Sequence, residues 1–129
     1  MSDLAGNPYA SIVELSKAYR NKSVSPSEVT KAQLARIDVL DTKLGSYQTI
    51  YSDEALAAAK VADEAFTKDS RLGPFHGIPF ALKDIYELKG QITTCGSYEM
   101  RQRISTETGT VVRRLLEAGG IAIGKTKTV

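Results

Sequence analysis

The sequence predicts an α/β fold in one domain spanning residues 1–129, with a helical lead (8–70) before an α/β portion (71–129). Two observations support this prediction. Apolar residues recur at helical spacing in the first portion, whereas short apolar runs alternate with glycine- and proline-rich turns in the second. The order strand, helix, strand after residue 78 also predicts parallel pairing, since a helix commonly connects parallel strands.

Three helices are predicted in the helical lead. The second has the clearest start, because Ser25 can cap it, Pro26 suits the first helical position and Glu28 completes a capping box. The first and third are indicated by apolar stripes, the third from about Asp53. The stripe residues of the three helices are, in turn, Ile12, Leu15 and Tyr19; Val29, Ile37 and Leu40; and Ala55, Ala58, Ala59, Ala62 and Phe66.

Short β-prone runs separate and follow these helices. Residues 46–51 form the first run, and apolar residues 80–82 and 121–123 predict two buried strands. Between the buried strands we expect an irregular loop with a short strand at 91–94. A helix then starts near Thr108 and stops at Ala118-Gly119-Gly120.

The composition excludes several classes of protein. The 17 basic and 15 acidic residues nearly cancel and no segment clusters Lys or Arg, so no nucleic-acid surface is indicated. No apolar run approaches the roughly 20 residues that a membrane span needs. The first residues resemble no secretory signal, and the single cysteine cannot form an internal disulfide. We therefore expect a cytoplasmic protein that is not bound to a membrane.

Residues 119–126, GGIAIGKT, match the phosphate-loop pattern G-x-x-x-x-G-K-[ST]. That loop needs a strand before it and a helix after it, so that phosphates meet the helix N-terminus. Here a helix precedes the match, and its middle residues are typical of a strand. We interpret the segment as a helix stop, a buried strand and a turn with two lysines, and keep nucleotide binding as a minor alternative.

Lys83 is the candidate catalytic residue. It follows the apolar run 80–82, and a lysine at the end of a buried strand can be partly desolvated, which lowers its pKa. A neutral lysine can accept a proton from a serine hydroxyl and activate that serine. From spacing alone, a surface lysine at a strand end is the favoured interpretation.

Five other polar residues have side chains capable of chemistry. Ser97 is a possible nucleophile, but a loop serine bonded to its own backbone is the simpler interpretation. Cys95 has no neighbouring cation in sequence, and His76 is interpreted as a turn residue. Lys125 and Lys127 are expected to be solvated. With one histidine and one cysteine, no metal site is predicted.

Three segments together resemble the amidase signature family in its N-terminal portion. They are LGPFHGIPFALKD (72–84), KGQITTCGS (89–97) and TVVRRLLEAGGIAIGKT (110–126). The preceding segment 11–38 is similar to helices that come before this region in family members. The resemblance covers about residues 10–129 and implies a mixed sheet flanked by helices, of which this chain holds an incomplete part.

This resemblance implies a hydrolase that cleaves carboxamide C–N bonds with a Ser–Ser–Lys triad and without a metal or organic cofactor. The lysine of its K-D motif maps onto Lys83. In the family both serines lie downstream of the G-K-T segment, so this chain is expected to hold the lysine and to be inactive alone. The family's usual Asn after G-K-T is Lys127 here, and its common Asp-Ala before T-V-V is Thr108-Gly109.

The resemblance leaves two matters open. It implies a small-molecule amide substrate for a complete enzyme, without choosing between an amide hydrolase and a tRNA-dependent amide transferase. It also implies a missing C-terminal portion or a second chain that supplies it. The alternative function is a non-enzymatic, truncated or split protein that acts only by association with a partner chain.

Overall fold

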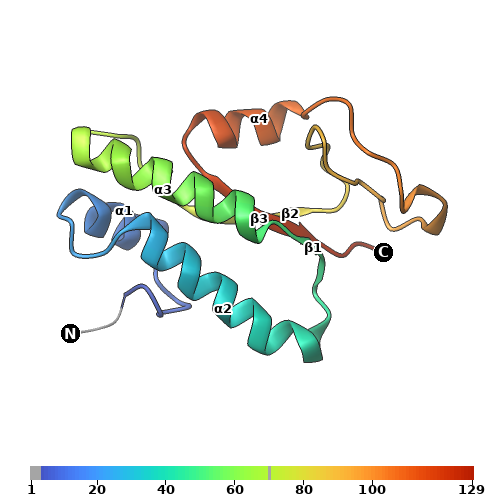
Figure 1. Ribbon diagram of the computed structural model, residues 1–129, viewed down its shortest axis with the longest axis horizontal. Coiled ribbons are helices and arrows are strands. Elements are labelled where there is room, and N and C mark those ends of the chain that lie inside the picture. Colours follow the sequence, from blue (N-terminus) through green and yellow to red (C-terminus); the bar gives the residue numbers. More distant parts are fainter. Residues whose placement is uncertain (1–3, 70) are drawn as a thin grey trace.

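The computed structural model describes residues 4–69 and 71–129. These residues form four α-helices, three strands and one short 3-10 helix (Figure 1). In chain order the elements are α1 (Ile12–Arg20), α2 (Pro26–Leu44), β1 (Tyr47–Ile50), α3 (Ser52–Lys68), β2 (Pro79–Lys83), η1 (Tyr98–Met100), α4 (Thr110–Glu117) and β3 (Ile121–Thr126).

The starts of the first two helices are set by capping boxes. In α2 the Ser25 hydroxyl accepts from the Glu28 backbone N–H, and the Glu28 carboxylate accepts from the Ser25 backbone N–H, as predicted. Ser11 and Glu14 make the same exchange at the start of α1. Gly45 ends α2 with a φ of 60°, a left-handed conformation that suits glycine.

Two apolar clusters form the core. One joins α1 and α2 to Phe66 of α3 and to Ile78 just before β2. The other packs the alanine face of α3 against Ile37 of α2 and against β3. The predicted alanine stripe is confirmed except at Ala58, which is exposed. Small side chains let α3 lie close to its neighbours, and α2 and α3 run side by side in Figure 1.

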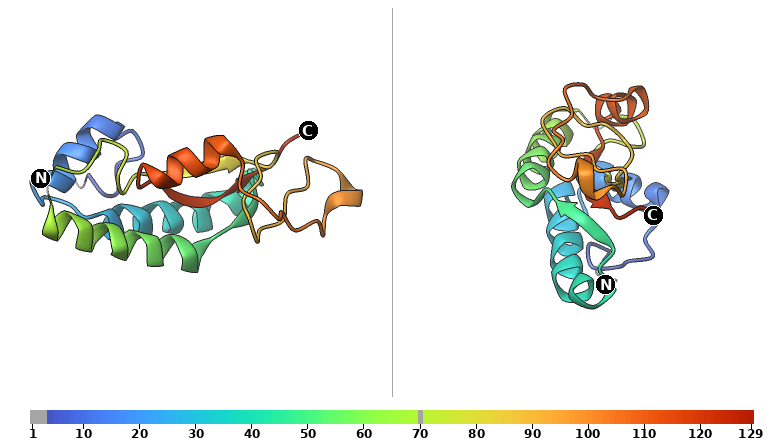
Figure 2. Two further views of the ribbon diagram at one scale, coloured as in Figure 1. Left: turned by 90° about the horizontal axis from the view of Figure 1, so that it is seen from above. Right: turned by 90° about the vertical axis from the view of Figure 1, so that its right-hand side faces the viewer.

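The three strands form one mixed sheet in the order β1-β3-β2. The predicted parallel pairing is confirmed for β2 and β3, whereas β1 joins β3 antiparallel, so the sheet is not parallel throughout. Figures 1 and 2 place α2 and α4 on opposite sides of these strands. The mixed sheet agrees with the fold class expected from the family resemblance.

A long irregular segment connects β2 to α4. The short strand expected at 91–94 is reduced to one isolated antiparallel bridge between Ile92 and Ile104. Backbone hydrogen bonds from Thr93 N–H to Arg103 O (3.1 Å) and from Ser105 N–H to Gln91 O (2.9 Å) hold the two arms of the segment together. The segment therefore returns on itself beside the ends of β2 and β3.

Candidate active site around Lys83

Lys83 stands at the carboxyl end of β2, beside the end of the parallel strand β3. Its register partner is Thr126, and the preceding pair is Leu82 with Lys125. Open α/β sheets carry their functional groups at the carboxyl ends of parallel strands. The backbone here is therefore in a favourable place for a reacting side chain.

The Lys83 side chain is exposed, so the expectation that this lysine is partly desolvated is wrong for these 129 residues. Its neighbours Leu82 and Asp84 are 4% and 1% exposed. Successive side chains of a strand point to opposite faces of the sheet. Lys83 therefore leaves the face opposite to the one that buries Leu82 and Asp84.

The backbone around Lys83 is fixed on both sides. Asp84 N–H donates to the Thr126 carbonyl at 3.0 Å, which extends the parallel ladder by one residue. The Asp84 carbonyl accepts from Cys95 N–H at 2.9 Å. The Lys83 carbonyl accepts from Ile85 N–H (2.7 Å) and Tyr86 N–H (3.0 Å) in a tight turn. The direction in which Lys83 projects is thus set by the backbone.

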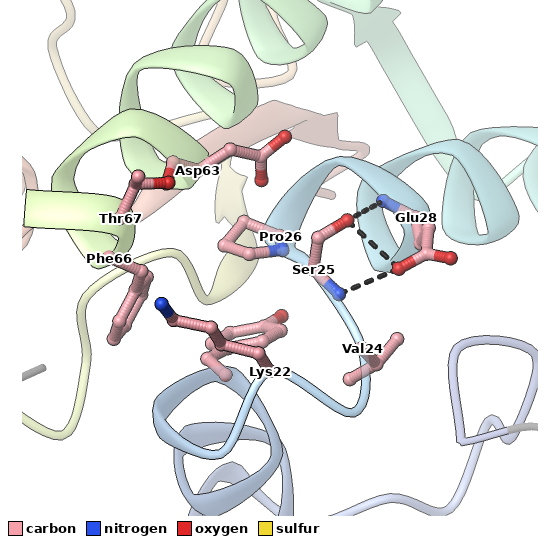
Figure 3. A pocket seen from close by; sticks show the side chains of 9 residues that line it. Lys22, Val24, Ser25, Pro26, Glu28, Asp63, Phe66 and Thr67 are labelled. Atoms are coloured by element: carbon pink, nitrogen blue, oxygen red, sulfur yellow. Dashed lines mark hydrogen bonds between the residues drawn. The ribbon is translucent and has the colours of Figure 1, made fainter.

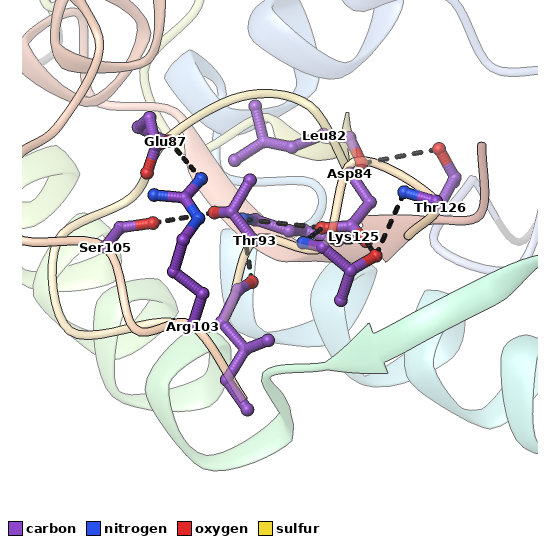
Figure 4. Close-up of polar contacts among 11 residues, drawn as sticks. Leu82, Asp84, Glu87, Thr93, Arg103, Ser105, Lys125 and Thr126 are labelled. Atoms are coloured by element: carbon purple, nitrogen blue, oxygen red, sulfur yellow. Dashed lines mark hydrogen bonds and ion pairs between the residues drawn. The ribbon is translucent and has the colours of Figure 1, made fainter. Parts of the chain in front are cut away.

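The buried lysine of this region is Lys125, which is 0% exposed; the expectation that it is solvated is wrong. Its Nζ donates to the Ile92 carbonyl at 2.9 Å and to Thr93 Oγ1, and lies 3.7 Å from Asp84 Oδ1 (Figure 4). Burial lowers the pKa of Lys125, while the Asp84 carboxylate acts in the opposite direction. Lys125 also lies in β3 and not in a turn.

Asp84 is the centre of the polar contacts on this face. Its carboxylate accepts from Thr94 N–H, at 3.2 Å to Oδ1, and from the Thr94 hydroxyl. With the ammonium of Lys125 nearby, the buried carboxylate has both hydrogen-bond donors and a counter-ion. This is the condition under which a buried charge is tolerated.

A chain of two hydroxyls leads to Lys125. Ser105 Oγ and Thr93 Oγ1 are 2.7 Å apart, and Thr93 Oγ1 accepts from Lys125 Nζ. The same three kinds of group, a serine, a second hydroxyl and a lysine, can also form a catalytic arrangement in which the lysine activates the serine as a nucleophile. However, Ser105 is 2% exposed and Thr93 is 0% exposed, so no substrate can reach them. This chain of groups is structural.

Sequence reasoning missed Lys125, although one signal was available. Residues 121, 123 and 125 fall on one face of a strand by the two-residue period, and Ile121 and Ile123 are buried. The same alternation places Lys125 on the buried face. The predicted strand ends at residue 123, so Lys125 falls outside it.

The other sequence candidates do not join Lys83 in one site. Ser97 caps η1 without a side-chain cap hydrogen bond, and its N–H donates to the Thr94 carbonyl at 2.9 Å. Cys95 is exposed and has a φ of 52°. His76 lies in a turn, as predicted, and its ring meets Phe66 edge-on at 5.5 Å; burial lowers its pKa. Across residues 4–69 and 71–129, no cluster of three His, Cys, Asp or Glu is arranged to hold a metal.

The phosphate-loop match is not a phosphate loop. α4 precedes the segment and ends at Glu117, and residues 121–126 form strand β3. The amine of Lys125 is engaged in buried contacts. A Cβ on Gly119, which has a φ of 88°, would collide with the His76 ring, so this glycine serves close packing. The predicted helix stop and buried strand are confirmed, so the segment lacks the strand–loop–helix order that a phosphate loop needs.

A cavity of about 240 Å³ lies where α1, α2 and α3 meet, and it is a poor candidate for chemistry (Figure 3). Lys22 and Asp63 line it, together with the Ser25–Glu28 capping box. The Tyr19 hydroxyl beside it is enclosed and has no hydrogen-bond partner within the described part of the chain. The cavity lies at the start of α2, whereas the end of α2 leads into β1 beside Thr126. Gly77, just before β2, lies against Pro26 and Tyr19 of the cavity lining, whereas Lys83 stands at the other end of β2.

Comparison with known proteins identifies relatives of this chain. The family model described as Amidase matches residues 28–129. A glutamyl-tRNA(Gln) amidotransferase subunit of Geobacter sulfurreducens is 44% identical over 112 residues, covering 87% of this chain and 23% of the relative. The protein of the same name from Acidothermus cellulolyticus is 38% identical and covers 98% of this chain and 24% of the relative.

Two solved structures with the same fold are named as an amidase and an amide hydrolase. Peptide amidase from Stenotrophomonas maltophilia aligns with a TM-score of 0.84 and 31% identity, covering 92% of this chain and 25% of that enzyme. A structure named fatty acid amide hydrolase aligns with a TM-score of 0.87 and 26% identity, covering 98% and 22%. The chain spans about a quarter of the length of these relatives. It belongs to the amidase family and corresponds to the N-terminal portion of that family.

Proposed function

We propose that this chain supplies the lysine base of a carboxamide hydrolysis, and that Lys83 is that base. The observation that carries the proposal is the placement of Lys83 at the carboxyl end of β2, exposed, on a backbone held from both sides. The K-D sequence at 83–84 resembles the lysine motif of the family, and it lies within the residues that the family model matches. The buried alternative, Lys125, has no access to a substrate.

In the proposed mechanism, Lys83 acts on two serines that lie outside residues 1–129. The neutral amine of Lys83 accepts a proton from the bridging serine, which accepts one from the nucleophilic serine. The serine oxygen bonds to the amide carbon, and the C–N bond breaks as a proton returns to the leaving amine. Water then hydrolyses the acyl-serine ester, which releases the carboxylic acid and restores the serine.

This role requires Lys83 to be neutral in part of the population. We infer that a further portion of the family fold covers the Lys83 face, because removal of water disfavours the ammonium form. Exposed apolar side chains next to Lys83 support such a cover. Ile85 and Tyr86, which follow it in the turn, are 43% and 40% exposed.

The proposed substrate is a carboxamide, since the names of the reported relatives all refer to the cleavage or transfer of an amide group. Amide transfer is the second candidate function, because identity to the amidotransferase relatives reaches 44%, against 31% for the peptide amidase. The third candidate is a protein that acts only through association with a partner, for which the exposed apolar residues are the supporting observation. No helix within the described ranges is long and apolar enough to cross a membrane.

The test is ammonia release by this chain co-expressed with the remaining portion of the Geobacter sulfurreducens relative. Glutamine, an amidated peptide and a fatty acid amide serve as probes. We expect release by the assembly, loss of release with Lys83→Ala, and full release with the exposed-lysine control Lys127→Ala. Activity that survives Lys83→Ala would refute the role of Lys83, and activity of the 129-residue chain alone would refute the external serines.

A further inference from the structure

We propose that Lys125 is a positioning residue for Lys83 and acts through Asp84. The inference rests on the proposed role of Lys83 as a base. Lys125 and Asp84 are 0% and 1% exposed, lie on the face opposite to the Lys83 side chain, and face each other with Nζ and Oδ1 3.7 Å apart. Neither residue reaches a substrate, so any effect on chemistry must pass through Lys83.

Asp84 transmits the effect because it is bonded directly to Lys83 and is held at three points. Its N–H donates to Thr126, its carbonyl accepts from Cys95, and its carboxylate accepts from Thr94. A residue anchored in this way cannot rotate about its backbone. The peptide plane that it shares with Lys83 is therefore fixed, and with it the direction in which the Lys83 side chain leaves the sheet.

Lys125 keeps Asp84 in this arrangement. The Lys125 ammonium carries three N–H donors. Three acceptors surround it, namely the Ile92 carbonyl, the Thr93 hydroxyl and the Asp84 carboxylate (Figure 4). One buried cation thus joins β3 to the beginning and the middle of the β2–α4 segment. Without it, the Asp84 carboxylate would be buried and uncompensated, and would move toward water.

The segment around this cation has additional ties that argue against a simple packing role. Ser105 bonds to Thr93 at 2.7 Å, and Arg103 pairs with Glu87 at the surface of the same segment. A Lys125 side chain that only filled space would be replaceable by methionine, which has similar length and no charge. The positioning role instead predicts that methionine releases Asp84 and then Lys83.

The experiment uses the 129-residue chain and three variants. They are Lys125→Met, the exposed control Lys127→Met, and the double variant Lys125→Met/Asp84→Asn, which removes the uncompensated charge and keeps a side-chain acceptor for Thr94. Hydrogen exchange is measured at the amides of Asp84 and Cys95. Both rates are divided by that of the Ile121 amide, which donates to Ile78 at the far end of the sheet and reports general loss of stability.

Lys125→Met should raise the normalised exchange by at least about 100-fold, the size expected when one member of a buried charge pair is removed. The double variant should return it to within about tenfold of the parent, because only neutral groups remain. Equal acceleration at all three amides would mean that Lys125 is structural only, and would overturn the proposal.

A second readout observes Lys83 itself. Its amine is labelled by reductive ¹³C-methylation, and the signal is identified by its absence in Lys83→Arg. We expect Lys125→Met to move this signal and Lys127→Met to leave it in place; an unmoved signal would overturn the proposal. Neither readout needs activity. A failure of the hydrolysis proposal would be seen as activity that survives Lys83→Ala, and it can therefore be distinguished from a failure of the positioning proposal.

In the co-expressed assembly, a displaced base should lower kcat by about 100-fold, whereas KM should stay within about twofold. The Lys125→Met variant is compared there with Lys127→Met. An unchanged kcat in an assembly that depends on Lys83 would refute the positioning role.

Discussion

Strands β1 and β3 approach each other closely at Gly124, and replacement of this glycine by alanine gives a direct test of the sheet. A Cβ at Gly124 would collide with the Thr49 carbonyl oxygen and would lie 3.1 Å from Ile50 Cα and Tyr47 Cδ1. The carbonyl belongs to the backbone, so it cannot move aside as a side chain can. The two strands would have to separate to accept even one methyl group.

The expected cost follows from these contacts. Overpacking in a well-packed region costs about 1–3 kcal/mol. The lower backbone entropy of alanine in the unfolded chain returns about 0.4–1 kcal/mol when the native conformation allows it. We expect Gly124→Ala to lower the free energy of unfolding by about 1–2 kcal/mol. With a urea m-value of about 2 kcal/mol/M, the midpoint should fall by about 0.5–1 M.

The assay is urea unfolding followed by circular dichroism, with Gly73→Ala as the matched control. A Cβ at Gly73 meets no atom within 4 Å, and this glycine has no positive φ. The control should therefore gain about 0.4–1 kcal/mol of stability. A wild-type midpoint for Gly124→Ala, or equal shifts for both variants, would refute the close strand contact.

Three further predictions concern a helix cap, a buried tyrosine and the phosphate-loop match. Ser25→Ala removes the capping box of α2 and should lower the free energy of unfolding in urea by about 0.5–2 kcal/mol. Ser52→Ala is the control, because α3 has no side-chain cap hydrogen bond. A smaller loss for Ser25→Ala than for Ser52→Ala would contradict the cap geometry. Burial, together with the charges of Asp84 and Glu54, raises the pKa of Tyr51 to about 12. The unfolded chain therefore loses this proton first, and stability should fall as pH rises from about 10 to 12. Tyr51→Phe should remove that part of the loss in alkaline unfolding curves, and an identical pH dependence would count against the shift. Calorimetry with ATP and GTP should give no binding heat, whereas heat abolished by Lys125→Met would restore the nucleotide alternative.

Local sequence signals predicted most elements of this fold. The Ser25-Pro26-Glu28 start became a helix because its cap contacts involve only residues three apart. The alanine stripe of α3 was readable for the same reason, since helical periodicity needs no distant partner. The predicted stop at Gly119 also holds, because a left-handed backbone suits glycine.

The remaining features depend on contacts between distant residues. The residues around 47–50 carry no local sequence signal for the antiparallel pairing of their strand with residues 124–126. Lys83 was expected to be desolvated because it follows an apolar run, but the alternation of a strand exposes it. Lys125 was expected to be solvated because lysines usually are, yet Asp84, Ile92 and Thr93 surround it from a segment 32 or more residues away in sequence. Such a buried pair becomes visible only when the fold brings its members together.

The central claim is that Lys83 is the reacting lysine and that the buried Lys125 positions it, and a paired measurement tests this claim most directly. Lys83→Met and Lys125→Met are compared for ammonia release by the co-expressed assembly and for urea stability of the 129-residue chain. We expect Lys83→Met to abolish release and change stability by less than about 0.5 kcal/mol. We expect Lys125→Met to lower release about 100-fold without abolishing it, and to lower stability by more than Lys83→Met does. The reverse pattern, with a stable Lys125→Met chain and an active Lys83→Met assembly, would contradict the account.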